Sequence, residues 1–428
     1  MNQPDNRANR QRVAVIGGGV AGIVAAHLLQ KSHDVTLLEQ GDYLGGHTHT
    51  IPIPDGVDAG TPVDTGFIVF NEATYPHFIR FLDELNVPSR QTEMSFGFQC
   101  LQTGLLYAGN NLNGLFAQRS NLFKPHFYQF LLEIWRFSRL AMADLDVGSD
   151  LGTLEQWVVR HRFMPFMVEN YLKPMAAAIW SAPTDQVAAF PARSFLLFFR
   201  NHGLLTFRNR PSWRTVSGGS WSYVKAFAQA FTGTIRLQAG VQRLHRTADS
   251  IRVEFADQPP QHFDQVVIAT HADQALRLLA DPTTEEQRLL GPWQYEANQT
   301  VLHTDLSVLP SAPRAWSCWN FRREAGKAAD QPVYVTYSMN QLQGLTTQKH
   351  YLVTLNRPSD YDESQVLARM VYHHPVYTVD SMATQAMLPT LNGIHRTYFC
   401  GSYFGYGFHE DAVRSSYQAA AQLQEHQA

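Results

Sequence analysis

The sequence predicts an α/β protein in which a domain built on a parallel sheet is interleaved with an α+β domain. Three observations lead to this fold. A strand, a glycine-rich turn, a helix and a second strand follow one another over residues 13–39, and apolar strand-like runs recur at 265–270 and 397–400. Buried strands of parallel sheets are typically continuous apolar runs. The chain therefore leaves the first domain and returns to it, so the two domains are not in series.

The composition is typical of a folded protein with much buried surface. Charged residues make up 17% of the 428 residues and aromatic residues 12%, against a usual charged fraction of about 25%. These values exclude a disordered chain and agree with the burial of a large cofactor or substrate. The net charge of −3 gives no support for nucleic-acid binding. No apolar run approaches the ~20 residues of a membrane span.

The N-terminus and the cysteines indicate a reducing, cytoplasmic location. Residues 1–12 are polar and contain no secretory apolar region. Cys100, Cys318 and Cys400 lie far apart and form neither a CxxC motif nor a disulfide framework. His373 and His374 are adjacent, so a strand or helix turns them in different directions. We therefore expect no metal site.

The first motif is a βαβ unit. Residues 13–16 form an apolar strand, 23–30 a helix and 35–39 a second strand, with the turn Gly17-Gly-Gly19-Val20-Ala-Gly22 after the first strand. In such a turn the first glycine permits the bend, the second lets the backbone approach a pyrophosphate, and the third lets helix and strand pack closely. Free N–H groups at the helix N-terminus then bind the phosphates.

The residues after this unit indicate which dinucleotide it binds. Glu39 lies 22 residues after Gly17, where a carboxylate can bind ribose hydroxyls. The pair Gly45-Gly46 follows before His47, and indicates a second backbone approach to the same ligand. A plain NAD domain does not need this pair, although two ordinary turns are the alternative. The run from Asp64 to Phe67 adds another glycine, and this pattern favours FAD while leaving NAD open.

Two helices are expected between residues 77 and 143. Residues 77–90 form a helix that Pro88 stops. Residues 126–143 form a helix with a wide aromatic face. This second helix is either buried in the core or forms a substrate-tunnel wall or a membrane contact.

A basic, aromatic-rich stretch lies between Asp185 and Asp249. Its 63 residues contain no acidic residue. Such a stretch favours an anionic partner, namely a carboxylate, a phospholipid headgroup or a membrane surface. The alternative is that its charges pair with acidic residues elsewhere in the chain. The nine basic residues are Arg193, Arg200, Arg208, Arg210, Arg214, Lys225, Arg236, Arg243 and Arg246.

The remaining patterns complete the two domains. A helix is expected at 223–231, two strands within 233–256, two more within 330–356, a loop at 402–408 and a helix from about residue 410. The predicted first domain is discontinuous and comprises residues 10–90, 211–285 and 390–428. Residues 91–210 and 286–389 form the predicted second domain, which covers the substrate.

Several segments carry a family resemblance. GGGVAG, LLEQ and LGGHTHT resemble the flavoprotein amine oxidase superfamily, which includes monoamine oxidases, phytoene desaturases and protoporphyrinogen oxidase. Over residues 12–425 the chain is similar to a bacterial subfamily of predicted FAD-dependent oxidoreductases. The segments that carry this similarity are VDTGFIVFNEATYP, PMAAAIWSAP, FPARSFLLFFRNHGLL, RPSWRTVSGGS, YSMNQLQGL, YLVTLNRP and FCGSYFGYGFHEDAV.

That subfamily is associated with modified fatty acid biosynthesis. Its genes often lie beside cyclopropane-fatty-acid-synthase-like methyltransferases, and one branch is implicated in desaturating methylated acyl chains on the way to furan fatty acids. The resemblance implies an FAD-binding Rossmann-like domain of the glutathione-reductase type, interleaved with an α+β substrate domain in an amine-oxidase-like arrangement.

The resemblance also assigns the cofactor site. It implies noncovalent FAD, because no cysteine occupies the usual attachment position and Cys400 is expected to be packed. The residues that it places at FAD are Gly17, Gly19, Val20, Gly22, Glu39, Gly45, Gly46, His47, Thr65, Gly66, Phe67, Val241, Gly401, Ser402, Glu410, Asp411, Ala412 and Val413.

This chain departs from the family pattern at a few positions. Tyr43 and His47 stand where amine oxidases usually have arginines, and Ser402 stands where they have an acid. Trp221 stands where the subfamily often has arginine. Two cationic contacts and one ribityl contact to the cofactor are therefore expected to differ.

The implied chemistry is hydride removal from a substrate carbon. Acyl desaturation also needs a base for a second proton, and the candidates are His409 and Glu410. The alternatives are a structural hydrogen bond for His409 and complementarity to a helix dipole for Glu410. The side chains expected to line the substrate cavity are those of Trp180, Tyr403, Tyr406 and Phe408.

The leading prediction is a cytoplasmic FAD-dependent oxidoreductase acting on an apolar acyl chain, as a fatty acid or a phospholipid. Peripheral contact with the inner membrane and a functional link to a fatty-acyl methyltransferase are further expectations. An amine oxidase and a redox-neutral double-bond isomerase are the alternatives, followed by a non-catalytic FAD-binding partner subunit.

Overall fold

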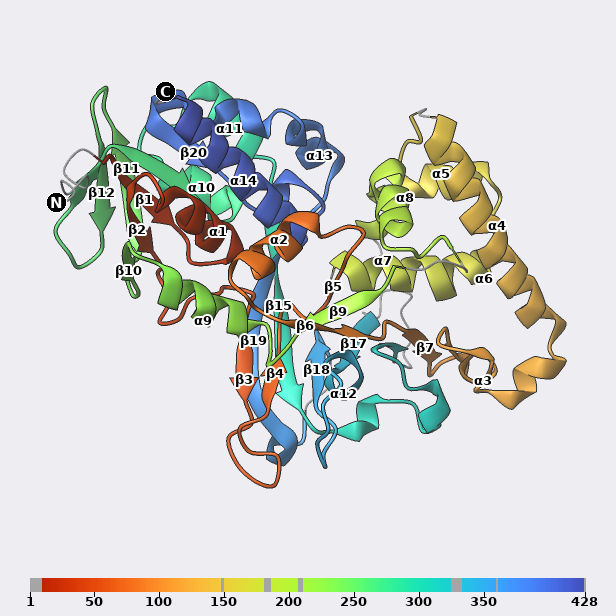
Figure 1. The fold of residues 1–428 in the computed structure, drawn as a ribbon. Helices are drawn as coiled ribbons and strands as arrows, with labels where there is room; N and C mark the ends of the chain where they lie inside the picture. The colour runs from red at the N-terminus through yellow and green to blue at the C-terminus, as the bar shows by residue number, and fades with distance from the viewer. Residues whose placement is uncertain are drawn as a thin grey trace.

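The computed structural model describes residues 10–147, 150–180, 186–206, 211–324, 333–358 and 361–426. Figure 1 shows a parallel sheet wrapped by helices on one side, a larger mixed sheet in the middle and a helical arm on the other side. Among the described helices, none is long and apolar enough to cross a membrane.

The parallel sheet is built from distant parts of the chain. Its order is β10-β2-β1-β14-β20 and all neighbouring strands are parallel. The predicted strands at 13–16, 35–39 and 265–270 are confirmed within a residue or two. The bounds are β1 Arg12–Ile16, β2 Asp34–Leu38, β10 Thr234–Arg236, β14 Gln265–Ile268 and β20 Thr397–Phe399.

The two faces of this sheet bury different layers. Val13 and Val15 of β1 face one core, whereas Ala14 and Ile16 face another, because successive side chains of a strand alternate. The first face packs against the helices α1 Val20–Leu29, α2 Pro76–Glu84, α9 Trp221–Ala230 and α14 His409–Glu425. The second face packs against α10 Ala272–Leu278 and the small antiparallel sheet β11 Val241–Arg246, β12 Ile251–Phe255 and β13 Gln261–Phe263.

The mixed sheet has seven strands in the order β19-β15-β18-β17-β16-β7-β8. Its neighbours are antiparallel except for β16 and β7, which are parallel. The strands are β7 Phe96–Cys100, β8 Leu106–Ala108, β15 Gln294–His303, β16 Trp319–Arg323, β17 Val333–Ser338, β18 Leu352–Leu355 and β19 Val366–Val376.

The helical arm follows β8 and has an aromatic core. Phe127, Phe130 and Phe137 of the long helix α4 are fully buried. This confirms a core helix near residues 126–143, although α4 is longer than predicted. The arm consists of α3 Leu112–Leu115, α4 Pro125–Val147, α5 Leu154–Arg160, α6 Pro165–Met167, α7 Lys173–Trp180 and α8 Ala192–Asn201.

One predicted helix is shorter than expected. Helix α2 ends at Glu84, and residues 89–92 form strand β6, so the prediction of a helix over 77–90 is wrong at its C-terminal end. Asn86 adopts a left-handed φ of 53°, which terminates the helix before Pro88 biases the chain toward extended structure. Strand β6 Ser89–Thr92 pairs with β9 Trp213–Val216, which also pairs with β5 Phe70–Asn71.

The shorter elements complete the chain between these layers. They are β3 Thr50–Pro52, β4 Pro62–Asp64, α11 Thr284–Leu290, α12 Met339–Leu342 and α13 Val379–Gln385.

Candidate functional site

A large cavity lies between the parallel sheet, the mixed sheet and the helical arm. Its volume is about 1630 Å³. Pockets for one drug-sized ligand are typically ~300–1,000 Å³, so this cavity has room for a dinucleotide and a second molecule. Its walls run from the glycine turn after β1 to apolar side chains of α3, α4 and α8.

Two of the three glycines of the first turn have separable roles. A Cβ on Gly22 would overlap the carbonyl oxygen of Gly17, so this glycine is required for helix packing. Gly19 has an ordinary φ of −71°, and a Cβ there would meet no protein atom within 4 Å. Because Gly19 lines the cavity, a side chain there would occupy space that the pyrophosphate of a dinucleotide needs.

The acid at the end of β2 is fixed beside this turn. Oε2 of Glu39 accepts a hydrogen bond from the Gly18 N–H at 2.6 Å, and Oε1 accepts one from the Gly41 N–H at 2.7 Å. The carboxylate lines the cavity together with Val241. It is therefore placed to meet ribose hydroxyls, as the sequence predicts.

The second glycine pair forms part of the same wall. The Gly45 N–H donates to the Gly18 carbonyl at 2.8 Å, and Gly45 and Gly46 have φ values of 128° and 57°. The Trp221 indole N–H donates to the Leu44 carbonyl at 2.9 Å and braces this loop. Tyr43 donates its hydroxyl hydrogen to the Gly46 carbonyl. Tyr43 and Trp221 therefore hold the loop through neutral hydrogen bonds and supply no positive charge where related proteins have arginine.

These residues fit FAD. Nε2 of His47 is buried against the cavity with no hydrogen-bond partner among the described residues, as expected of a polar group that awaits a ligand. Most of the residues predicted to hold FAD line the cavity, and the exceptions are Gly22, Glu410, Asp411 and Val413. The predicted residues that line it are Gly17, Gly19, Val20, Glu39, Gly45, Gly46, His47, Thr65, Gly66, Phe67, Val241, Gly401, Ser402 and Ala412.

The structure gives Glu410 a different role from the one predicted. Its Oε1 accepts from the His77 N–H at 3.0 Å and from His77 Nδ1 at 2.7 Å, while Oε2 accepts from the Phe78 N–H at 2.9 Å. Glu410 therefore satisfies the first free N–H groups of helix α2. Because the carboxylate is engaged there and does not line the cavity, the prediction that it acts as a base is corrected.

The next residues of α14 are also structural. Oδ2 of Asp411 accepts from the N–H groups of Tyr406 and Phe408, which holds the loop before the helix. Burial raises the pKa of Asp411 to about 6. Val413 packs in the core shared with α1. Of the residues predicted at this helix start, Ala412 and His409 reach the cavity.

His409 lies in a buried polar group. Its ring stacks on Phe67 with 3.6 Å between centroids. Nε2 lies 2.9 Å from the Tyr223 hydroxyl and 3.1 Å from the Thr48 hydroxyl. Burial holds the pKa of His409 well below its usual range. The predicted structural hydrogen bond is therefore present, and it occupies the nitrogen that a base would use.

The far part of the cavity is apolar and aromatic. Among the described lining residues, Glu39 is the one acid and Arg277 of α10 the one lysine or arginine, and both lie at the nucleotide end. Tyr403, Tyr406 and Phe408 line the wall as predicted. The substrate arm, as we call the far part, is further lined by Phe96, Leu112, Leu115, Leu131, Ile134, Trp135, Tyr171, Met175, Phe198, His202 and Trp213.

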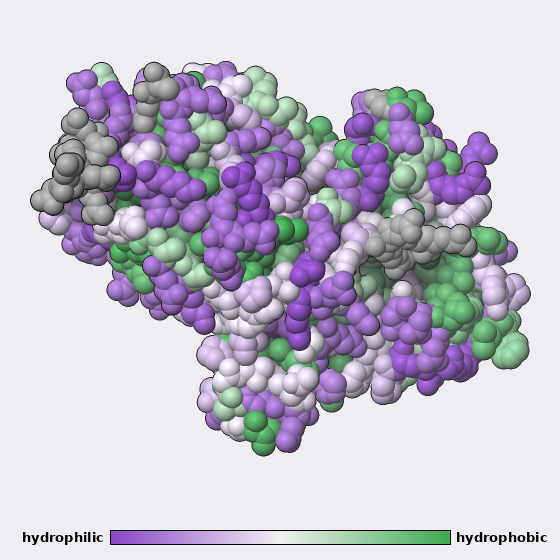
Figure 2. All heavy atoms as spheres, in the orientation of Figure 1, coloured by the Kyte–Doolittle hydropathy of each residue, from purple (hydrophilic) through white to green (hydrophobic). Residues whose placement is uncertain are grey.

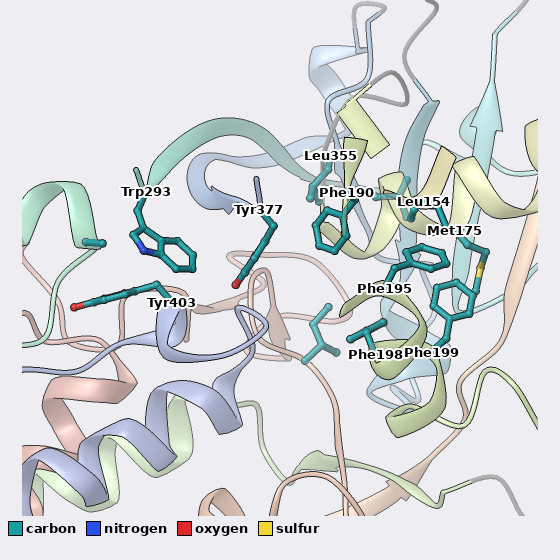
Figure 3. Close-up of a cluster of buried hydrophobic side chains, with 14 of the residues drawn as sticks. Leu154, Met175, Phe190, Phe195, Phe198, Phe199, Trp293, Leu355, Tyr377 and Tyr403 are labelled. Atoms are coloured by element: carbon teal, nitrogen blue, oxygen red, sulfur yellow. The ribbon is translucent and has the colours of Figure 1, made fainter. Parts of the chain in front are cut away.

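Two tyrosines that line the cavity have hydroxyls without partners among the described residues. The hydroxyls of Tyr377 and Tyr403 are buried and bond to no described residue. Both rings pack against Trp293, with centroid separations of 5.7 and 5.8 Å. Figure 3 shows this group beside the phenylalanine cluster of α8. The side chain of Trp180, also predicted here, lies outside the described side chains.

A histidine that the sequence analysis did not single out lies in the substrate arm. His202 follows α8, and its Nδ1 lies 3.0 Å from the Phe198 carbonyl oxygen. A carbonyl only accepts, so Nδ1 carries the hydrogen and Nε2 is a free acceptor. Nε2 is buried with no partner among the described residues. Burial lowers the pKa of His202 to about 4, so the ring is neutral at pH 7.

Little in the local sequence predicts that His202 lies in the substrate arm. Rings of Phe198, Trp213 and Phe408 surround His202, with the Phe408 centroid 5.1 Å away. These three come from α8, β9 and the loop before α14, which only the tertiary structure brings together. A lone histidine in the aromatic segment FFRNHGLL is the one sequence feature that points to it.

A second group of histidines lies where the mixed sheet meets the cavity. The ring centroid of His47 lies 5.4 Å from that of His374 and 6.2 Å from that of His271. Burial lowers the pKa of His374 and of His271 to about 3 and that of His47 to about 4. His373 is exposed but also lines the cavity, with its ring centroid 6.4 Å from that of His271. The described residues contain no cluster suited to a metal ion.

Three described residues of the basic stretch pair with acidic residues from other segments. Arg246 makes a buried ion pair with Glu286 at 2.5 Å, Arg214 pairs with Glu72 at 3.0 Å, and Arg200 lies 3.8 Å from Asp146. The acids therefore come from other segments, which is the alternative named for this stretch. Arg208 and Arg210 lie outside the described residues.

Comparisons with known proteins agree with this geometry. The family model "Flavin containing amine oxidoreductase" matches residues 20–309. The FAD-dependent oxidoreductase pigF of Monascus ruber is 43% identical over 81 residues, and the flavin-dependent L-tryptophan oxidase RebO of Lentzea aerocolonigenes is 47% identical over 47 residues. These matches cover 18% and 11% of this chain, and they span 17% and 10% of the relatives' own lengths.

The fold is also that of solved enzyme structures. Cyclohexylamine oxidase from Brevibacterium oxydans IH-35A aligns with a TM-score of 0.68 at 15% identity, over 98% of this chain and all of that one. A CLA-producing fatty acid isomerase from P. acnes aligns with a TM-score of 0.66 at 13% identity, over 95% of this chain and 97% of that one.

Fold, glycine turns and cavity together define an FAD-dependent oxidoreductase with an amine-oxidase-like architecture. The chain belongs to the flavin-containing amine oxidoreductase family.

Proposed function

We propose that the protein oxidises an apolar acyl chain, removing hydrogen from an unsaturated or methylated fatty acid or phospholipid. The observation that carries this proposal is the uncharged substrate arm. Its described lining side chains include no carboxylate, lysine or arginine, so a long alkyl chain fits it without an unpaired buried charge. The resemblance to the bacterial subfamily linked to methylated and furan fatty acids supports the same substrate class.

The chemistry divides between cofactor and protein. When bound, FAD supplies a two-electron acceptor for hydride. Desaturation also releases a proton from the neighbouring carbon, which a basic group must accept. We assign this role to Nε2 of His202, because it carries no hydrogen, has no partner among the described residues and belongs to a residue that lines the substrate arm. The bonding electrons of that second C–H bond then form the new double bond.

Two alternatives keep specific support. The fatty acid isomerase of P. acnes shares this fold, and an isomerase would return the hydride and release no electrons. The family model and the cyclohexylamine oxidase favour an amine substrate. A cationic amine lacks a carboxylate partner in the described part of the arm, so we place this alternative behind the lipid.

The test is anaerobic mixing of the FAD-loaded protein with separated bacterial lipid fractions and with amines. Loss of the visible absorption of oxidised flavin with a methylated or unsaturated lipid, but not with amines, is the expected result. Bleaching by amines alone would overturn the proposal. Lipids with moved double bonds and no net bleaching, measured by mass spectrometry, would replace the oxidase with the isomerase.

A variant pair tests the proposed base. His202→Ala should slow flavin reduction by roughly 10²–10⁴-fold while leaving FAD binding unchanged. The exposed His262→Gln is the matched control and should behave as the unmodified protein. An unchanged rate and pH profile in His202→Ala would exclude His202 as the proton acceptor.

A further inference from the structure

An exposed apolar surface lies on α3, on the short 3-10 helix η1 Arg119–Phe123 and on the start of α4. We call it the arm patch, and its members belong to a segment of 24 residues, 112–135. Phe123 is 85% exposed, Leu112 76%, and Leu132 63%. The full set is Leu112, Leu122, Phe123, Tyr128, Leu132 and Trp135. In Figure 2 apolar residues gather at the lower right, where Figure 1 places α3 and the first turns of α4.

The arm patch is continuous with the substrate arm. Leu112 and Trp135 are exposed and also line the cavity, so they form its rim. Leu131 and Ile134 line the cavity from the neighbouring face of α4. Tyr128, Leu132 and Trp135 follow the spacing of one helix face. An apolar path therefore leads from the outer surface of α4 into the cavity.

The charges around the arm patch are mostly positive. Residues 101–143 contain Arg119, Lys124, Arg136 and Arg139 but one acid, Glu133. The Glu133 carboxylate is already bound by Arg136 at 3.0 Å and by the Met164 N–H. Arg139 lies over the Trp135 ring at 4.8 Å. Basic side chains beside exposed tryptophan and leucine are typical of helices that lie in the interface of an anionic bilayer.

We propose that the arm patch docks on an anionic lipid bilayer and lets an acyl chain pass directly from the membrane into the substrate arm. This inference rests on the proposed function, because a lipid substrate explains why the patch surrounds the cavity rim. The proposed partner of the arm patch is thus a membrane surface, and not a second copy of the chain or another protein.

The first test is flotation of the FAD-loaded protein with vesicles of phosphatidylcholine and phosphatidylglycerol in equal parts. The variant Phe123→Ser/Leu132→Ser changes two patch residues that do not line the cavity. It should lower the bound fraction by about tenfold or more, since two apolar side chains no longer enter the lipid. The matched control, Val379→Ser/Ile394→Ser, changes two exposed apolar residues far along the chain and should float as the unmodified protein.

A second experiment tests the contribution of the basic residues to membrane binding. Binding should fall in vesicles of phosphatidylcholine alone and at high salt, because the basic residues then lose their partners. Equal flotation of the patch variant and the unmodified protein would overturn the proposal. A dimer in solution that the patch variant converts to monomers would assign the surface to a second copy instead.

Activity in detergent separates this proposal from the proposed function. With a lipid substrate dispersed in micelles, the patch variant should bleach at the rate of the unmodified protein, because the substrate arm is intact. If the unmodified protein bleaches in micelles but does not float with vesicles, the docking proposal fails alone. If it floats but no lipid fraction bleaches it, the proposed function fails alone.

Discussion

The Asn298 side-chain amide donates a hydrogen bond to Nδ1 of His374 across the β15–β19 pair, at 3.0 Å. Neighbouring bonds fix the direction of this bond. The Gln299 N–H donates to Oδ1 of Asn356, so Nδ2 of Asn356 donates to Oδ1 of Asn298. The remaining Asn298 nitrogen must then face His374 and the Glu296 carbonyl. His374 therefore carries its hydrogen on Nε2 and presents a donor at the cavity.

This relay predicts a single tautomer of His374. In NMR spectra of protein labelled with ¹⁵N-histidine, the His374 signals are identified as those missing from the His374→Gln variant. They should show a protonated Nε2 and an unprotonated Nδ1. Asn298→Leu removes the donor to Nδ1, so its spectrum should show a mixture of both tautomers. A single Nδ1–H form in the unmodified protein would contradict the hydrogen-bond assignment.

Three partly buried histidines at the cavity wall predict a loss of stability in acid. The pKa values of His47, His271 and His374 are lowered to about 4, 3 and 3, against ~6.5 when unfolded. Below about pH 6.5 the unfolded state binds more protons than the folded state. The contribution of these histidines to the free energy of unfolding is therefore complete above that pH, and it is lost as the pH falls toward their folded-state pKa values. Each histidine contributes a slope of up to about 1.4 kcal/mol per pH unit.

Denaturant unfolding between pH 4 and 7 measures this slope. His374→Gln should flatten it, whereas the exposed His262→Gln should not. Asp64 and Asp411, whose pKa values burial raises to about 7 and about 6, act in the opposite sense, and the comparison between variants cancels them. Parallel curves for His374→Gln and the unmodified protein would show that His374 does not carry the effect.

The glycine turn predicts two different failures. Gly19→Val should give a folded protein without FAD, because its side chain meets no protein atom and fills the cavity instead. Gly22→Val should destabilise the fold by about 3 kcal/mol or more, because its Cβ overlaps the Gly17 carbonyl. Flavin absorbance and thermal unfolding separate the two outcomes. A Gly19→Val protein that purifies fully loaded with FAD would refute the cofactor site.

Glu410 predicts a change in stability without a change in rate. Glu410→Gln replaces one of the two acceptor oxygens that hold the start of α2, at a cost of about 1–3 kcal/mol. The melting temperature should fall while flavin reduction by substrate keeps its rate. A loss of about 10²-fold in rate at an unchanged melting temperature would restore Glu410 as a base.

Prediction from sequence succeeded best where a local pattern suffices. The βαβ unit, the strand at 265–268 and the start of α14 were located because apolar runs and glycine turns are read within a few residues. The C-terminal end of α2 was missed because Asn86 adopts a left-handed conformation. Asparagine can adopt this conformation but does so in a minority of cases, so its presence does not predict a helix end. The role of Glu410 was mispredicted for a different reason. Its place in the chain beside the predicted FAD-binding residues did not reveal that its carboxylate is bound to the start of α2.

The sequence by itself determined the class of fold and the FAD-binding turn, because these depend on glycine positions and strand periodicity. Only the tertiary structure decided which polar groups are free. It engages Glu410 with α2 and His409 with Tyr223 and Thr48, and it leaves Nε2 of His202 without a partner in the described residues. Availability for chemistry depends on contacts between distant segments, and no local pattern records those contacts.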